Sequence, residues 1–134
     1  MKNVMFVCQD NTYSQIAEAW MRSFVADGIF VVSAGLNNRQ SSPTSPKLVD
    51  VMNEVDIDIS DHQPKLLSDY RPENFDAVIS LCDFSMRLPE KWMLSRIFDE
   101  WILPHLELDS NDSCRHIRDD IRDKVDLLLM RYAA

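Results

Sequence analysis

The chain has 134 residues, of which 46% are hydrophobic and 27% charged, a balance typical of one globular domain with a buried core. Its net charge of −8 argues against nucleic acid or an anionic membrane as a partner, because both would be repelled. No apolar run approaches the roughly 20 residues that span a bilayer, and the short apolar start lacks the pattern of a secretory signal, so we expect a cytoplasmic protein.

Predicted strands and helices alternate in the first half of the chain. A continuously apolar run predicts a buried strand at residues 3–8, and a helical pattern opens at Ser14 and ends before Gly28. Residues 29–33 form a second predicted strand, and Pro46 stands where the first turn of a helix is expected.

The second half continues the same alternation. Residues 57–68 are predicted to be irregular, and an apolar run predicts a strand at residues 75–81. A further strand is predicted at residues 97–101, and a final helix from about Asn111 to the C-terminus. Strands that alternate with helices imply right-handed crossovers. We therefore expect a single α/β domain over residues 1–134, with a parallel central sheet flanked by helices in three layers.

Three cysteines, Cys8, Cys82 and Cys114, lie far apart in the sequence. An odd number in a cytosolic chain argues against a disulfide framework, and none of them has the spacing of a zinc site, so we expect no metal and no cofactor. Cys8 ends the first predicted strand, and Cys82 follows the strand at residues 75–81. Ligands of parallel sheets lie beyond the carboxyl ends of the strands, so both cysteines are candidate active-site residues.

The place of Cys8 between a strand and a helix is typical of a reactive thiol. The backbone N–H groups of such a loop converge on one point, where the helix dipole also favours negative charge. A cysteine in this position is expected to exist partly as thiolate and to act as a nucleophile. The alternative is that Cys8 is simply a small buried residue at a strand end.

Residues along most of the chain resemble the low-molecular-weight protein tyrosine phosphatases and the thioredoxin-coupled arsenate reductases. The signature that residues 4–18 resemble is a strand, then Cys, two residues, Asn, two residues, Arg, Ser, Gln, a hydrophobic residue, Ala and Glu. The other similar segments are Ser33-Ala34-Gly35, residues 52–60, residues 76–82, residues 88–92 and residues 98–101. The last two are similar to the arsenate reductase branch. The resemblance implies that family's α/β fold.

The resemblance also implies roles for individual residues. It makes Cys8 the catalytic nucleophile and Cys82 the resolving cysteine, which forms a disulfide with it. The implied substrate-binding residues are Asn11, Thr12, Tyr13 and Ser14. In a reductase, thioredoxin or glutaredoxin would then be the partner that restores the thiols.

The loop after Cys8 departs from the family pattern. The family spacing is Cys-x5-Arg-Ser, whereas here one residue fewer separates Cys8 from Ser14 and no arginine lies between them. Arginine binds a tetrahedral oxyanion with two parallel N–H groups. The loss of one such group costs roughly 3–4 kcal/mol of transition-state stabilisation. Asp10 adds a negative charge to the loop, and a replacement cation would have to come from elsewhere, such as Arg39 or Arg87.

Two further departures concern proton transfer and redox chemistry. His105 stands where the family has the aspartate that protonates the leaving group. Histidine can donate a proton near neutral pH, but a surface histidine in an ordinary loop is the alternative. The next cysteine of the reductase cascade would fall near Phe84, which has no thiol.

These departures lead us to expect an arsenate reductase-like protein that has lost ordinary catalysis. It would act as a binding or regulatory protein that takes a protein or a small ligand at its former active-site face. The alternative is a thiol-dependent reductase of arsenate or a related substrate, with Cys8 as nucleophile and Cys82 as resolving cysteine. A protein tyrosine phosphatase is the third hypothesis, and it is disfavoured because both the arginine and the aspartate are missing.

Overall fold

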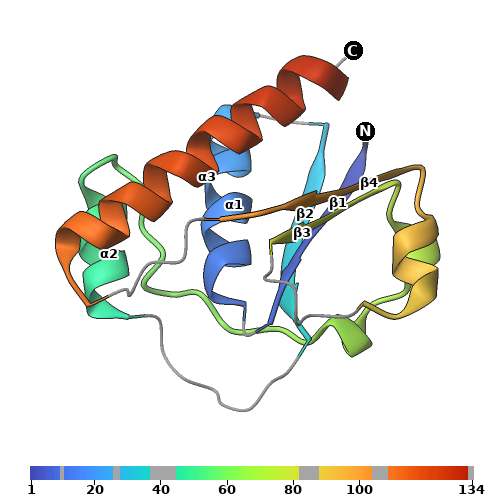
Figure 1. Ribbon diagram of the computed structural model, residues 1–134, viewed down its shortest axis with the longest axis horizontal. Helices are drawn as coiled ribbons and strands as arrows, with labels where there is room; N and C mark the ends of the chain where they lie inside the picture. The colour runs from blue at the N-terminus through green and yellow to red at the C-terminus, as the bar shows by residue number, and fades with distance from the viewer. Residues whose placement is uncertain (10, 26–27, 37–44, 82–87, 104–108, 133–134) are drawn as a thin grey trace.

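The structure is a computed structural model and contains a four-stranded parallel sheet with the strand order β2-β1-β3-β4 (Figure 1). It describes residues 1–9, 11–25, 28–36, 45–81, 88–103 and 109–132. The strands are β1 (Asn3–Cys8), β2 (Phe30–Gly35), β3 (Ala77–Leu81) and β4 (Ile97–Trp101). All three strand pairs are parallel, which confirms the predicted α/β class.

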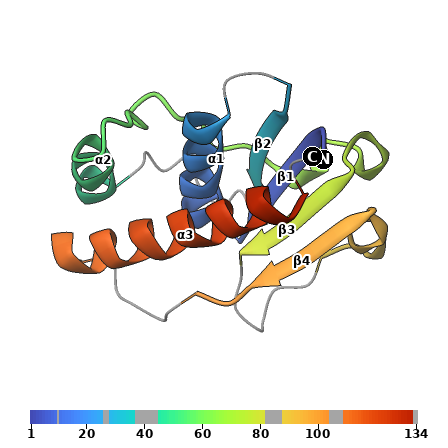
Figure 2. The ribbon, with the colours of Figure 1, turned by 90° about the horizontal axis from the view of Figure 1, so that it is seen from above.

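The three α-helices lie on one side of the sheet (Figure 2). They are α1 (Thr12–Phe24), α2 (Pro46–Asn53) and α3 (Asn111–Tyr132). Alternate residues of β1, such as Val4 and Phe6, face these helices, because successive side chains of a strand point to opposite sides. α1 lies directly on the sheet, and α3 packs against both α1 and α2.

The opposite face of the sheet is covered by short 3-10 helices and loops. These helices are η1 (Leu67–Asp69), η2 (Pro72–Asn74) and η3 (Glu90–Leu94). Met5 and Val7 of β1 pack on this side with Leu67 and Trp92. Both faces of the sheet are therefore buried, which explains why β1 reads as a continuous apolar run rather than an alternating one.

Two element boundaries differ from the prediction for identifiable reasons. α1 begins at Thr12 rather than Ser14, because Asn11 adopts a left-handed conformation with φ of 70° and its carbonyl already accepts a hydrogen bond from Gln15. β3 begins at Ala77, because Phe75 lies before the strand and packs against Trp92 in the hydrophobic cluster on the face of the sheet opposite the α-helices.

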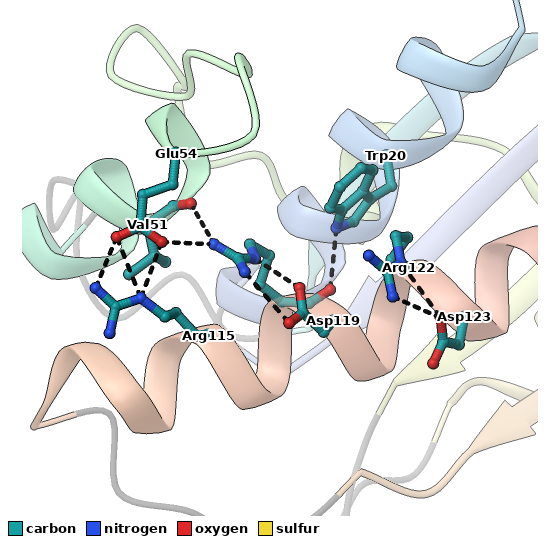
Figure 3. A network of polar contacts seen from close by, with 8 residues as sticks. Trp20, Val51, Glu54, Arg115, Asp119, Arg122 and Asp123 are labelled. Carbon is teal, nitrogen blue, oxygen red and sulfur yellow. Dashed lines mark hydrogen bonds and ion pairs between the residues drawn. The ribbon is translucent and has the colours of Figure 1, made fainter.

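A polar network fixes α2 against α3 (Figure 3). The Glu54 carboxylate accepts hydrogen bonds from Arg115 and Arg118, and the bond from Arg115 is the main reason that the pKa of Glu54 is lowered to about 2. Arg118 also donates to the carbonyl of Val51, and its own carbonyl accepts a hydrogen bond from Trp20 Nε1 at 3.0 Å. The network thus joins all three helices.

The carboxyl ends of β1 and β3 lie side by side. Val7 pairs with Ser80, so Cys8 and Leu81 end their strands at the same level. Within the described ranges, none of the helices combines the length and the apolar composition needed to cross a membrane.

Candidate active site

Cys8 lies at the end of β1, beside the first turn of α1, and only 1% of it is exposed. Its Sγ atom is 3.1 Å from the hydroxyl oxygen of Ser14 and accepts a hydrogen bond from the Ser14 backbone N–H at 3.4 Å. A thiolate has no proton to give, so in that state the Ser14 hydroxyl must be the donor. The Ser14 backbone N–H therefore favours a negative charge on Cys8, and the single hydroxyl proton of Ser14 is shared between Sγ and the Ala34 carbonyl oxygen, which lies 3.3 Å from the hydroxyl.

The side-chain amide of Asn11 holds the loop in place with all of its hydrogen-bonding groups. Its Nδ2 group donates to the hydroxyls of Ser14 at 2.7 Å and Ser33 at 3.0 Å. Its Oδ1 atom accepts the Lys65 backbone N–H at 3.0 Å and lies 3.0 Å from His62 Nε2. An asparagine amide has two N–H donors and two lone pairs on its oxygen, and here all four are engaged. Asn11 thereby connects the loop to β2 and to the segment that follows α2.

His62 contributes to this network as a neutral imidazole. An amide oxygen only accepts hydrogen bonds, so Nε2 of His62 carries the proton that it donates to Asn11. Burial, followed by the charge of Lys65, lowers the pKa of His62 to about 4. The ring is therefore uncharged at neutral pH, and it positions Asn11 without adding positive charge to the site.

A buried carboxylate lies beneath the loop. Glu18 on α1 is 6% exposed, and one of its oxygens accepts a hydrogen bond from Ser33 Oγ at 2.6 Å. Its charge is compensated by Arg22, whose Nη2 is 3.1 Å away, and by Lys65, whose Nζ is 3.7 Å away. Arg22 and Lys65 thus both form ion pairs with Glu18.

The structure brings some of the predicted site residues together. Ser14 contacts Cys8 directly, and Asn11 donates a hydrogen bond to Ser14. Thr12 and Tyr13 form the first turn of α1 and are half-buried, and Tyr13 packs against the core on the helix side of the sheet. The other predicted residues lie outside the described ranges; they are Cys82, His105, Arg39 and Arg87.

Sequence analysis missed four residues that complete the site. They are Glu18, Ser33, His62 and Lys65. The sequence did contain a signal for Ser33, because a serine within an apolar strand is expected to be buried and a buried hydroxyl needs a hydrogen-bond partner. No local pattern distinguishes His62 and Lys65, which lie in a segment without periodicity. A parallel bridge between Gly35 and Leu66 brings that segment alongside β2.

The described part of the chain offers no evident metal centre. In these ranges, His, Cys, Asp and Glu side chains form no group of three that could hold a metal ion. The chemistry that the arrangement supports is that of a nucleophilic thiolate at the start of a helix, held by a rigid hydrogen-bonded loop.

Comparison with known proteins gives relatives over the whole chain. A Synechocystis sp. protein named glutaredoxin arsenate reductase is 35% identical over 134 residues, which cover 99% of this chain and all of the relative. An arsenate reductase of Staphylococcus xylosus is 37% identical over 82 residues, 60% of each chain. A solved structure of an arsenate reductase in the phosphate-binding state has a TM-score of 0.86 at 35% identity and 98% coverage of both chains.

These similarities confirm the resemblance and the fold that it implied. The fold of the solved arsenate reductase matches that of this chain along nearly its entire length. The profile of the low molecular weight phosphotyrosine protein phosphatases matches residues 3–131, which include Cys8, the loop after it and all four strands. The chain therefore belongs to the low molecular weight phosphotyrosine protein phosphatase family.

Proposed function

We propose that this protein is a thiol-dependent arsenate reductase with Cys8 as the nucleophile and Cys82 as the resolving cysteine. The observation that carries the proposal is the hydrogen bond from the Ser14 N–H to Cys8 Sγ at the start of α1, where the Ser14 hydroxyl also lies 3.1 Å from the same sulfur. A hydrogen bond of this kind favours the thiolate, which is the nucleophilic form of cysteine. The full-length similarity to a glutaredoxin arsenate reductase supports the same function.

The proposed reaction has two steps. The Cys8 thiolate attacks the arsenic of arsenate, an S–As bond forms, and one oxygen leaves as water after it is protonated. The Cys82 thiolate then attacks Cys8 Sγ, so that an S–S bond forms and the S–As bond breaks. The electron pair of that bond passes to arsenic, which leaves as arsenite, and the two thiols become a disulfide.

The position of Cys82 in the chain supports its role as the attacking thiol. β3 ends at Leu81, level with Cys8 on the adjacent strand, and Cys82 is the next residue. The chain's third cysteine, Cys114, belongs to the first turns of α3 and is fully buried. We assign the proton for the departing oxygen to His105, which comes after β4 in the sequence; β4 itself ends at Trp101, level with Leu81 of β3.

The proposed reductant of the disulfide is a glutaredoxin. The name of the Synechocystis relative supports this choice. Turnover needs such a partner, because each cycle consumes two electrons from the Cys8 and Cys82 thiols.

A second candidate function is non-catalytic binding through the same face. The observation that favours it is the loop itself, which is one residue shorter than the family pattern and has no arginine between Cys8 and Ser14. This candidate keeps the fold and the ordered loop but predicts no turnover.

An arsenite-release assay separates the two candidates. The purified protein is incubated with arsenate, glutathione and a glutaredoxin, and arsenite is measured. We expect turnover that is lost in Cys8→Ser and Cys82→Ser and kept in the matched control Cys114→Ala. Background arsenite in the unmodified protein, with folding intact by circular dichroism, would leave only the binding function. Turnover that survives Cys82→Ser would remove that residue from the mechanism.

A further inference from the structure

We infer that Lys65 is a positioning residue for the chemistry of Cys8, because its ammonium group, through the ion pair with Glu18, holds the Asn11 side chain in the orientation that the loop after Cys8 requires. This inference rests on the proposed function and extends it to a residue outside that loop. The observation that carries it is a closed ring of polar contacts that begins and ends on Lys65.

The ring joins four residues from different parts of the fold. The Lys65 backbone N–H donates to Asn11 Oδ1 at 3.0 Å, and Asn11 Nδ2 donates to Ser33 Oγ at 3.0 Å. The Ser33 hydroxyl donates to Glu18 Oε1 at 2.6 Å, and the same carboxylate oxygen lies 3.7 Å from Lys65 Nζ. A backbone N–H can only donate and a carboxylate can only accept, so the direction of each hydrogen bond in the ring is fixed.

The ring reaches Cys8 through Asn11. Its direction turns the NH₂ end of the Asn11 amide toward two serine hydroxyls, and the second of these bonds goes to Ser14 Oγ at 2.7 Å. The Ser14 hydroxyl oxygen in turn lies 3.1 Å from Cys8 Sγ. If the amide were turned over, its oxygen would face Ser14 and compete for the hydroxyl proton. The ring therefore keeps that proton available to Sγ.

The Lys65 ammonium matters because Glu18 is buried. Only 6% of Glu18 is exposed, and a buried carboxylate is stable only when its charge is compensated. Without the ammonium, Arg22 would be the remaining ion-pair partner of Glu18 in the described part of the chain, and its side chain is 61% exposed. We expect the carboxylate to turn toward Arg22 and water, and to draw the Ser33 hydroxyl away from Asn11.

The backbone of Lys65 is fixed independently of its side chain. Its carbonyl accepts a hydrogen bond from the Gly35 N–H at 2.7 Å, beside the bridge between Gly35 and Leu66. A substitution of the Lys65 side chain should therefore leave the segment next to β2 and act on the ring.

The test follows alkylation of Cys8 by iodoacetamide, a neutral reagent, by mass spectrometry of its peptide over a range of pH. Lys65→Met removes the ammonium, and Lys65→Arg keeps the positive charge. We expect Lys65→Met to slow alkylation at neutral pH about fivefold, the factor that corresponds to one net hydrogen bond, and to raise the pH at which the rate is half-maximal. Lys65→Arg should restore most of the rate. An unchanged rate in Lys65→Met would overturn the inference.

Lys124→Met is the matched control. Lys124 forms an ion pair with Asp120 on α3, and its side chain is 27% exposed, against 30% for Lys65. This substitution removes an equally exposed ammonium that has no part in the ring, so the alkylation rate should stay unchanged. Slowing as large as that in Lys65→Met would overturn the inference, because it would show a general effect of lost charge.

The Glu18→Gln background separates positioning from a direct effect of the Lys65 charge on the thiolate. Glutamine has no charge to compensate, and its Oε1 atom can still accept the Ser33 hydroxyl, so the ring no longer needs the ammonium. We expect Lys65→Met to cause no further slowing in this background. Equal slowing in both backgrounds would mean that the charge acts on Cys8 through space, and it would overturn the inference.

Arsenite release distinguishes this inference from the function on which it rests. Slower alkylation in Lys65→Met, in a protein that releases no arsenite, supports the positioning of Cys8 and overturns the reductase function. Arsenite release that depends on Cys8, with unchanged alkylation in Lys65→Met, supports the reductase function and overturns the role of Lys65.

Discussion

Replacement of Asn11 by alanine should destabilise the fold by about 3–5 kcal/mol. The change removes four hydrogen bonds and leaves two donors, the Lys65 N–H and His62 Nε2–H, without their acceptor. A fully buried donor that loses its partner costs about 1–3 kcal/mol, and because these two are only partly buried we take about 1–2 kcal/mol for each. Alanine at a φ of 70° adds about 1 kcal/mol, because its Cβ disfavours the left-handed conformation that Asn11 adopts.

The matched variant Asn11→Gly separates these two contributions. Glycine loses the same hydrogen bonds but tolerates a positive φ, so Asn11→Gly should be about 1 kcal/mol more stable than Asn11→Ala. Urea unfolding followed by far-UV circular dichroism measures both. With a slope of about 1–3 kcal/mol per molar urea, the Asn11→Ala midpoint should fall by about 1–5 M. An unchanged midpoint, or a glycine variant no more stable than the alanine variant, would refute this account of Asn11.

Three further outcomes follow from the site and the helix network. Ser14→Ala removes the hydroxyl beside Cys8 Sγ, so iodoacetamide should alkylate Cys8 more slowly at neutral pH, as measured by mass spectrometry. An unchanged rate would mean that the Ser14 backbone N–H is enough to favour the thiolate. Because burial lowers the pKa of His62 to about 4, the folded state binds fewer protons than the unfolded chain, and stability should fall as the pH drops from about 6.5 to 4. Urea midpoints across that range should show this fall, and His62→Gln should lack it. Glu54→Gln should lower the urea midpoint at neutral pH more than the control Asp123→Asn does. Because the pKa of Glu54 is about 2 in the folded state, its contribution to stability should persist until the pH falls below about 4.5.

β1, β2 and β3 were predictable because each is a run of mostly buried, apolar residues. β4 is half-buried or exposed except at Trp101. β1 and β4 have the predicted boundaries, and the other two strands shift by one or two residues at their ends. The contact between Cys8 and Ser14 was also predictable, because both residues belong to one strand–loop–helix unit. Local sequence carries enough information when the interacting residues are close in the chain.

The partners of Asn11 were not predictable in the same way. Ser33 and His62 lie 22 and 51 positions from Asn11, and only the folded sheet brings them together. The segment around His62 has neither strand nor helix periodicity, so its position beside β2 is set by tertiary contacts such as the bridge from Leu66 to Gly35. The expectation of lost catalysis came from the three departures from the family pattern, and the arsenate reductase relatives favour the alternative hypothesis instead.

The long sequence separations within the Asn11 network have a consequence for the newly made chain. Cys8 and Asn11 leave the ribosome well before His62 and Lys65, since synthesis proceeds from the N-terminus at about 5–20 residues per second. Until the later segment folds onto β2, the Asn11 Oδ1 atom lacks the two protein donors that it has in the folded domain. The hydrogen-bond network of Asn11 is therefore completed only when the domain closes, after both of its parts have been synthesised.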